Sequence, residues 1–150
     1  MGLARRLMHL ATHLHARVYR STGGRLLGRL GHLEQVLLTT TGRRTGAPRT
    51  VPLAATLVGS SIVLVASDGG APGHPAWYLN LTAEPEVVVQ RGRRAAAMLA
   101  RVAVGPERDV LWAAVVKNNP GYARYQEKTP REIPVVVCEL STGTRPAPAP

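Results

Sequence analysis

Three arginines lie close together in one stretch of the chain, Arg43, Arg44 and Arg49, with threonines and two glycines around them. Guanidinium groups donate paired hydrogen bonds to phosphate or carboxylate oxygens. Glycine allows positive φ angles, so that backbone N–H groups can also approach a ligand. The stretch 39–52 therefore predicts an anion-binding loop. A solvated basic turn fits the same spacing equally well, and the stretch alone does not decide between the two.

Further segments carry residues that suit a flat ligand. Gly69 and Gly70 follow an apolar run and allow close backbone approach. Trp77 can stack on such a ligand or belong to the core. Tyr122 and Tyr125 are three residues apart, so a helix would place them on one face, where they can cap a pocket. Each of these residues also fits an ordinary structural role when it is taken alone.

Residues for nucleophilic or metal catalysis do not form a recognisable pattern. Cys138 stands in an apolar, strand-like run, where thiols are usually inert. The nine acidic residues are scattered. His9 and His13 are four residues apart, but no third ligand or general base stands near them, so no metal site is expected. If such a chain is an enzyme, its chemistry comes from a cofactor.

The positive charge of the chain gathers in its first third. Residues 1–49 carry +8 of the net charge of +10, because they hold nine arginines against a single acid, Glu34. A basic end of this kind implies an anionic partner: phosphates, an acidic ligand tail, nucleic acid or lipid head groups.

Length and composition limit the class of protein. A chain of 150 residues with 45% hydrophobic residues predicts one domain with a real core. Cys138 is the only cysteine, so no intrachain disulfide can form. No apolar run reaches the roughly 18 residues of a membrane-spanning helix. His and Arg interrupt the N-terminal run, so it lacks a signal-peptide core and a cytoplasmic protein is the default expectation.

Short strand-like runs separated by turn residues fill the middle of the chain. We predict strands at 35–40, 50–58, 62–67, 86–90, 94–104 and 134–140. Helices are predicted at 3–20, 75–83, 107–118 and 122–128. Mostly antiparallel strands with short turns indicate an α+β fold, a small barrel with helices outside, whose closure removes exposed strand edges.

Three regions follow from this pattern. An N-terminal amphipathic helix and basic linker take up 1–33, a barrel domain 34–140, and a disordered Pro/Ala-rich tail 141–150. The apolar stripe of the helix consists of Leu3, Leu7, Leu10, Leu14 and Val18. We expect this stripe to pack over the sheet, and contact with an anionic membrane surface through residues 3–20 is the alternative.

Taken in order, these segments resemble the deazaflavin-dependent nitroreductase and quinone reductase family, actinobacterial proteins that use coenzyme F-420, an 8-hydroxy-5-deazaflavin. The similarity runs from about residue 36 to residue 140 and rests on several short motifs. These motifs are at 37–46, 48–49, 52–53, 66–70, 75–81, 120–122, 125–126, 129 and 133–139. The resemblance implies a split β-barrel related to FMN-binding barrels, and hydride transfer from reduced F-420 to quinone-like or nitro-aromatic acceptors.

The resemblance also implies roles for individual residues. Arg43, Arg44 and Thr45 would hold the cofactor's phosphate and acidic polyglutamate tail. Ser67 would border the reacting end of the deazaflavin ring, and Tyr122 and Tyr125 would line the acceptor pocket. A hydroxyl of Ser67 or Tyr125 would stabilise the oxyanion that grows on the acceptor. The remaining cofactor-binding residues implied are Arg49, Pro52, Leu53, Ala66, Asp68, Gly69, Gly70 and Trp77.

Two residues depart from the family pattern. Asp68 follows Ser67 where a Lys or another non-acidic residue is expected, which weakens anion binding on that side. Asn119 replaces an aromatic residue of some relatives, which favours quinones over nitroimidazoles as acceptors. In relatives the N-terminal helix can favour membrane association, which would place a cytoplasmic protein peripherally on the inner face of the cell membrane.

Two other functions remain open at this point. An FMN-binding reductase of the wider barrel superfamily is the enzymatic alternative, with FMN the less favoured cofactor. A non-enzymatic basic module that binds anionic lipid or nucleic acid is the other. We do not expect nucleic acid, because the aromatic residues are not interleaved with the arginines as a base-stacking surface requires.

Overall fold

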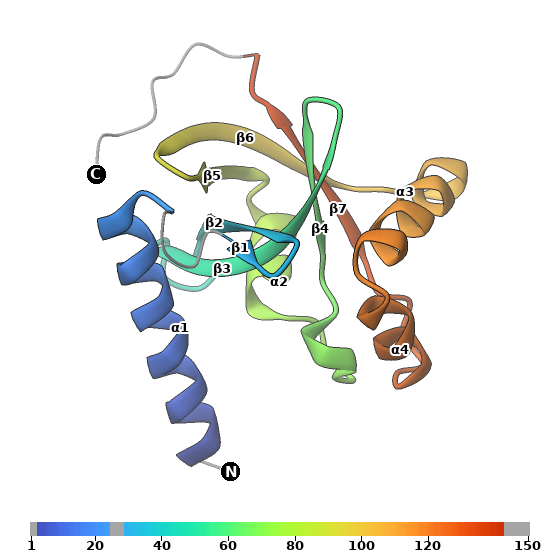
Figure 1. Ribbon diagram of the computed structural model, residues 1–150, viewed down its shortest axis with the longest axis horizontal. Coiled ribbons are helices and arrows are strands. Elements are labelled where there is room, and N and C mark those ends of the chain that lie inside the picture. The colour runs from blue at the N-terminus through green and yellow to red at the C-terminus, as the bar shows by residue number, and fades with distance from the viewer. Residues whose placement is uncertain (1–2, 25–28, 143–150) are drawn as a thin grey trace.

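An antiparallel barrel of six strands forms the centre of the computed structural model, which describes residues 3–24 and 29–142, with side chains from 10 to 24 and from 31 to 142 (Figure 1). Around the barrel the strands follow the order β2, β3, β4, β7, β6, β5. Their bounds are β2 Leu33–Thr41, β3 Pro48–Val58, β4 Ser61–Val65, β5 Glu86–Arg91, β6 Arg94–Val102 and β7 Val135–Leu140. A two-residue strand, β1 (Arg29–Leu30), extends the sheet beside β2.

Strand β2 closes the barrel because it pairs on both sides. It pairs with β3 along most of its length and with β5 over three residue pairs, Leu37 with Gln90, Leu38 with Val89 and Thr39 with Val88. The last strand, β7, lies between β4 and β6. The predicted α+β barrel of mainly antiparallel strands is therefore confirmed, and every predicted strand is present with ends shifted by a few residues.

Valine, leucine and alanine fill the barrel, as a chain without Phe requires. Side chains alternate along each strand, so Val36 and Leu38 of β2 point inward together with Val87 and Val89 of β5. Cys138 lies fully buried in this core. Burial raises the pKa of its thiol to about 12, so the thiol stays protonated at neutral pH, in line with the expectation that it is unreactive.

Within the described residues, four α-helices and a short 3-10 helix lie around the barrel (Figure 1). Their bounds are α1 Leu3–Thr22, η1 Asp68–Gly70, α2 Ala76–Ala83, α3 Gly105–Asn118 and α4 Gly121–Glu127. Pro106 stands in the first turn of α3, where its missing N–H costs nothing. Helices α3 and α4 cover the outer side of β4 and β7, where Val63, Val137 and Ile133 form a second buried cluster.

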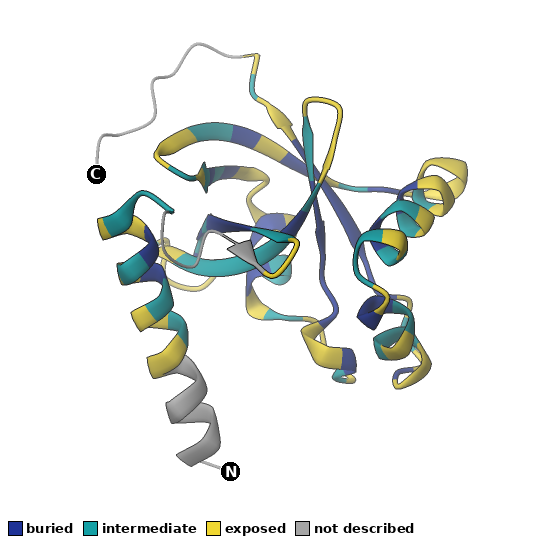
Figure 2. Ribbon diagram, viewed as in Figure 1, coloured by how far each residue is buried: buried dark blue, intermediate teal, exposed yellow. Residues whose placement is uncertain are grey.

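Among its described side chains, helix α1 packs on the barrel core through its C-terminal turns. Tyr19 is buried beside Leu37 and Ala16, and its hydroxyl donates to Gln35 O (3.0 Å) and accepts from Gly92 N (2.6 Å). The axis of the helix points away from the barrel (Figure 1), and residues 10–15 are mostly exposed (Figure 2). Leu10 and Leu14 are 72% and 64% exposed, so the prediction that they pack over the sheet is wrong. The helix docks through the face of Ala16 and Tyr19 instead.

Some predictions fall on residues that are not described. The side chains of Leu3 and Leu7 lie outside the described part, as do linker residues 25–28 and residues 143–150 of the predicted tail. In the described part of the chain, no helix is long and apolar enough to cross a membrane.

Candidate functional site

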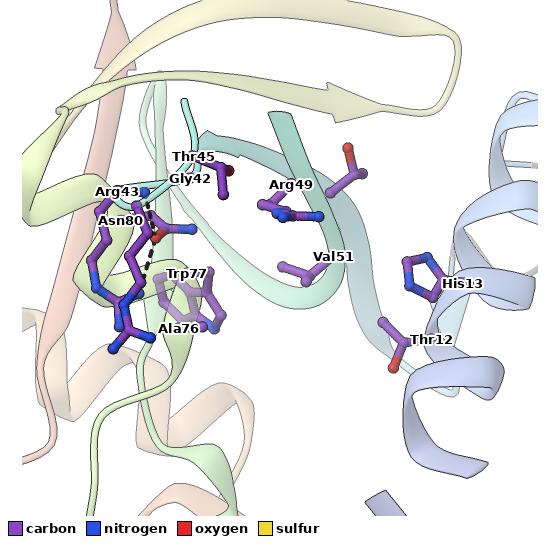
Figure 3. Close-up of a pocket in the computed structure, with 12 residues that line it drawn as sticks. Thr12, His13, Gly42, Arg43, Thr45, Arg49, Val51, Ala76, Trp77 and Asn80 are labelled. Atoms are coloured by element: carbon purple, nitrogen blue, oxygen red, sulfur yellow. Dashed lines mark hydrogen bonds between the residues drawn. The ribbon is translucent and has the colours of Figure 1, made fainter. Parts of the chain in front are cut away.

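A cleft of about 400 Å³ opens beside the predicted anion-binding loop (Figure 3). Four segments line it: helix α1, the loop after β2, the first part of β3, and helix α2. The lining residues are Thr12, His13, Gly42, Arg43, Arg44, Thr45, Arg49, Thr50, Val51, Ala76, Trp77 and Asn80. The structure therefore brings Arg43, Arg44, Thr45, Arg49 and Trp77 of the predicted site together around one cavity.

The loop between β2 and β3 is an ordered turn. Gly42 N donates to Ala47 O (2.8 Å), and Gly46 N donates to Gly42 O (2.7 Å). Gly46 has a φ of 70°, which favours glycine. Thr45 Oγ1 accepts from Ala47 N (3.2 Å), so this hydroxyl fastens the turn as well as facing the cleft. The turn thus presents the arginines from a fixed backbone.

Asn80 fixes the direction of Arg43. Its amide is buried, only 4% exposed, and its Nδ2 donates to Thr40 Oγ1 (3.1 Å). Its Oδ1 accepts from both the backbone N and Nη1 of Arg43, each at 3.2 Å (Figure 3). Helix α2 therefore orients the loop after β2 through one side chain. Sequence reasoning noted Asn80 within a motif but gave it no role.

The cleft carries positive charge, and no acidic side chain in its lining neutralises that charge. Arg43, Arg44 and Arg49 are all exposed, and none of the twelve lining residues is acidic. The ion pairs of the described residues form elsewhere, for example Arg91 with Glu34 and Arg101 with Glu107 and Glu139. Exposed guanidinium groups that converge on a cavity without a carboxylate provide a site for an anion.

Helix α1 forms the wall of the cleft opposite α2 (Figure 3). Arg20 Nη2 donates to Thr50 Oγ1 (2.9 Å), and this hydroxyl also lies 2.8 Å from Thr39 Oγ1. This hydrogen-bonded chain joins the helix to strands β3 and β2. No local pattern identifies Thr12 or His13 as lining residues, because only the docking of α1 brings them to the cleft.

The segment after β4 forms a strained turn against α4. Asp68 has a φ of 45°, the only positive value of a non-glycine residue in the described chain, and Gly69 and Gly70 follow with 64° and 84°. A Cβ atom on Gly70 would lie 2.8 Å from Tyr125 O. Ser67 is buried, whereas Asp68 and Gly69 are exposed. The turn 67–70, predicted to border the deazaflavin ring, therefore lies beside Tyr125, which is predicted to line the acceptor pocket.

The two tyrosines of α4 differ in environment. Tyr122 is 8% exposed and packs in the cluster beneath α3 and α4, and burial raises the pKa of its hydroxyl. Tyr125 is partly exposed, with its ring centroid 6.4 Å from that of Tyr122 and 5.5 Å from Lys128 Nζ. Asn119 Oδ1 accepts from Gly121 N (3.0 Å), so this departure from the family pattern serves the start of α4.

The predicted site residues Pro52, Leu53 and Ala66 do not line the cleft. Pro52 and Leu53 lie on β3, and Leu53 packs partly buried against the barrel core. Ala66 is fully buried in that core. Trp77 is 8% exposed and belongs both to the core and to the cleft lining, so the two interpretations of this residue are not exclusive.

Comparisons with known proteins point to one family. A family model described as F420H(2)-dependent quinone reductase matches residues 11–140. An F420H(2)-dependent quinone reductase of Mycobacterium tuberculosis strain H37Rv is 41% identical over 128 residues, which are 83% of this chain and 86% of that protein.

Solved structures agree with the sequence comparison. A structure of an F420-H2 dependent reductase, FDR-A, is 44% identical with a TM-score of 0.66, over 70% of this chain and 93% of that one. A heme-binding protein from Mycobacterium smegmatis is only 19% identical, with a TM-score of 0.56 over 71% of this chain and 46% of that one, and is similar in fold alone.

Proposed function

The chain belongs to the F420H(2)-dependent quinone reductase family, and from this premise we propose that it transfers a hydride from reduced coenzyme F-420 to a quinone-like acceptor. When bound, the cofactor supplies the hydride. The chain's own residues bind the cofactor, orient it and stabilise the charge that develops on the acceptor. The observation that carries the assignment of the site is the cleft that Arg43, Arg44 and Arg49 line together, with no acidic residue among the lining residues.

The donors of the cleft fit the anionic part of this cofactor. Its phosphate and polyglutamate tail present oxygens that guanidinium groups bind in pairs. Arg43 and Arg44, which line the cleft, would bind these oxygens, Arg49 would approach from β3, and Thr45 would add a hydroxyl. Because Asn80 and the turn hold Arg43 in place before the ligand arrives, less conformational entropy is lost on binding.

We assign the reacting end to the turn 67–70 and helix α4. Ser67, Gly69 and Gly70 would border the deazaflavin ring, and Trp77 would pack beside it. Ala66, Pro52 and Leu53 would complete this part of the site. The phenol of Tyr122 is protonated at neutral pH, as a tyrosine ordinarily is, and burial raises its pKa further, so its hydroxyl can donate a hydrogen bond. Tyr125 or Ser67 donates a hydrogen bond to the acceptor oxygen as that oxygen gains negative charge. The exposed Asp68 places a negative charge at the edge of this region.

Quinones are the preferred acceptors in this proposal, with nitro-aromatic compounds second. Flat acceptors gain from stacking on aromatic rings. Asn119 accepts a hydrogen bond from the first residue of α4, at a position where an aromatic side chain would add a stacking surface. Reduction of a quinone should therefore be faster than reduction of a nitroimidazole under matched conditions.

Helix α1 also presents a surface that suits contact with a membrane, where a lipid-soluble quinone would be located. Leu10 and Leu14 are exposed on it, and exposed Arg17 and Arg20 are the basic residues of its C-terminal half. We propose that this helix lies peripherally on an anionic membrane, on the cytoplasmic side of the cell membrane. Co-sedimentation with anionic vesicles tests this. The double variant Leu10→Gln and Leu14→Gln should lose vesicle binding and keep cofactor binding, and equal sedimentation of both proteins contradicts it.

Titration with reduced F-420, followed by its fluorescence, tests the activity assignment. We expect binding at micromolar concentrations and oxidation of the cofactor on addition of a quinone. A protein that binds no F-420, or that purifies with a bound yellow flavin, overturns the proposal.

A charge reversal tests the site. Arg44→Glu should weaken F-420 binding by roughly 100-fold or more, because a like charge then faces the anionic tail. Arg94→Glu makes the same charge change at an exposed position outside the cleft and is the matched control. Equal affinity of the two variants would mean that the arginine loop is a solvated turn.

A further inference from the structure

One arginine outside the cleft holds the turn 67–70 in place. The guanidinium of Arg131 donates from Nε to Ala71 O (2.9 Å), from both Nη atoms to Ala66 O (3.2 Å each) and from Nη2 to Ser67 O (2.9 Å). Nη1 also lies 3.2 Å from His74 Nδ1, which is the acceptor because a guanidinium has no lone pair to offer. These five contacts match the five N–H donors of an arginine.

The hydrogen bonds of Arg131 stabilise a turn whose backbone is strained. Asp68 adopts a left-handed φ that costs energy for a residue with a Cβ, and the turn has only two backbone hydrogen bonds of its own. Those bonds run from Gly70 N to Ser67 O (2.9 Å) and from Ala71 N to Asp68 O (3.1 Å). Ser67 O thus accepts from both Gly70 and Arg131, which ties the turn directly to the guanidinium.

Arg131 is itself fixed by the helix that carries the tyrosines. Gln126 of α4 donates from Nε2 to Arg131 O (2.7 Å), and its Oε1 accepts from Ile133 N (2.9 Å). On the other side of the turn, Gly70 lies against the backbone of Tyr125. The turn is therefore held between α4 and the segment that follows α4, with Arg131 as the link.

The chemistry of these contacts explains why an arginine stands here. Carbonyls of Ala66, Ser67 and Ala71 point to one place, and a planar group with five diverging donors can satisfy them together. A lysine has three donors on one atom and cannot bridge the same set. None of the hydrogen bonds described for the guanidinium goes to a carboxylate, and four of the five go to backbone carbonyl oxygens.

We propose that Arg131 is a positioning residue that sets the shape of the turn 67–70 and its place against Tyr125. This inference rests on the proposed function, in which the turn borders the deazaflavin ring and Tyr125 lines the acceptor pocket. Arg131 then aligns cofactor and acceptor with each other, while the cleft arginines hold the cofactor's charged end. Loss of Arg131 should lower the rate of hydride transfer and leave cofactor affinity nearly unchanged.

Two measurements on Arg131→Met separate these effects. In protein without cofactor, the amides of Gly70 and Ala71 should exchange with deuterium faster than in the wild type, with the barrel strands unchanged. In turnover with F-420 and a quinone, kcat should fall by roughly 10- to 100-fold, because small misplacements of reacting groups cost that much. The dissociation constant for F-420 should change by less than about threefold, because the cleft arginines are intact.

Matched variants test the specific role of the guanidinium. Arg101→Met removes an arginine that binds Glu107 and Glu139 instead, and it should leave exchange at 67–71 and kcat unchanged. Arg131→Lys should behave like Arg131→Met. In Arg131→Ala, added guanidinium ion at non-denaturing concentration should restore part of kcat.

Three results would overturn the proposal: unchanged exchange of Gly70 and Ala71, faster exchange spread evenly over the barrel, or full activity of Arg131→Lys. A wild-type protein that fails to bind F-420 would instead remove the proposed function. In that case the exchange measurement still decides whether Arg131 holds the turn.

Discussion

Asn80 Oδ1 accepts two hydrogen bonds from the same residue, one from the backbone N of Arg43 and one from its guanidinium, each at 3.2 Å. The residues are 37 positions apart, on α2 and on the loop after β2. Since the other end of the buried amide donates to Thr40, Asn80 joins the barrel wall, the turn and the arginine in one chain. The direction of a cleft arginine is therefore set from inside the protein.

The substitution Asn80→Ala should weaken F-420 binding. Without the amide, Arg43 loses both contacts and samples other rotamers, so ordering this side chain on binding costs about 1 kcal/mol more. We therefore expect a roughly 5- to 10-fold higher dissociation constant. The free energy of unfolding should also fall by about 1–3 kcal/mol, because the buried Thr40 hydroxyl loses its donor. Fluorescence titration and urea denaturation measure the two effects.

Thr82→Ala is the control for this substitution. Thr82 lies on the same helix, is exposed, and donates only to Leu79 O (2.9 Å). It should bind F-420 as the wild type does. If Asn80→Ala is less stable but binds F-420 with wild-type affinity, Asn80 serves the fold alone.

Adjacent glycines allow a test of the packing between η1 and α4. Both Gly69 and Gly70 have positive φ, but a Cβ on Gly69 would meet open space, whereas one on Gly70 would lie 2.8 Å from Tyr125 O. Gly69→Ala should therefore cost about 1 kcal/mol of backbone strain. Gly70→Ala has the same strain and must also push α4 away from the turn. We expect it to reduce quinone turnover at least roughly tenfold more than Gly69→Ala does. Equal turnover numbers would show that this contact is unimportant for catalysis.

The stability of the barrel should fall at alkaline pH, partly through Cys138. Its pKa is about 12 in the folded protein and near the ordinary value of 9.0 when the chain is unfolded. Between these values the unfolded chain binds fewer protons, so the free energy of unfolding decreases as pH rises above 9. The decrease from this thiol approaches about 1.4 kcal/mol per pH unit. Its stabilising effect is fully present below pH 9.

Urea denaturation at pH 7.5, 9 and 10 measures this slope. Cys138→Ala should unfold more easily at pH 7.5, because it leaves a small cavity, but should lose less stability between pH 9 and pH 10 than the wild type. Tyr19 and Tyr122, whose pKa values burial also raises, add their contribution only above about pH 10. Parallel slopes for the two proteins contradict the assignment to Cys138.

The barrel could be predicted because its signals are local. Alternation of apolar residues marked each long strand, and glycines 59 and 92 marked the turns. The leucine stripe of α1 was predicted to pack because it is apolar, but periodicity does not say whether a sheet lies opposite. Leu10 and Leu14 are exposed, since Tyr19 directs a different face of the helix to the barrel.

The site was predictable only where chemistry gathers in one segment. Arg43, Arg44, Thr45 and Arg49 share one turn, and the structure groups them in one cleft. Thr12, His13 and Asn80 join that cleft across the fold, so no local pattern identifies them. Arg131 stands alone between Pro130 and Glu132 in the sequence, and its importance lies in carbonyl groups about 60 positions away.

The place of β7 has a consequence for synthesis of the chain on the ribosome. Its residues 135–140 pair with β4 on one side and β6 on the other, so both neighbours keep unpaired edges until this late segment has emerged. A nascent chain that stops short of it cannot complete the barrel, and its open edges invite association with other chains.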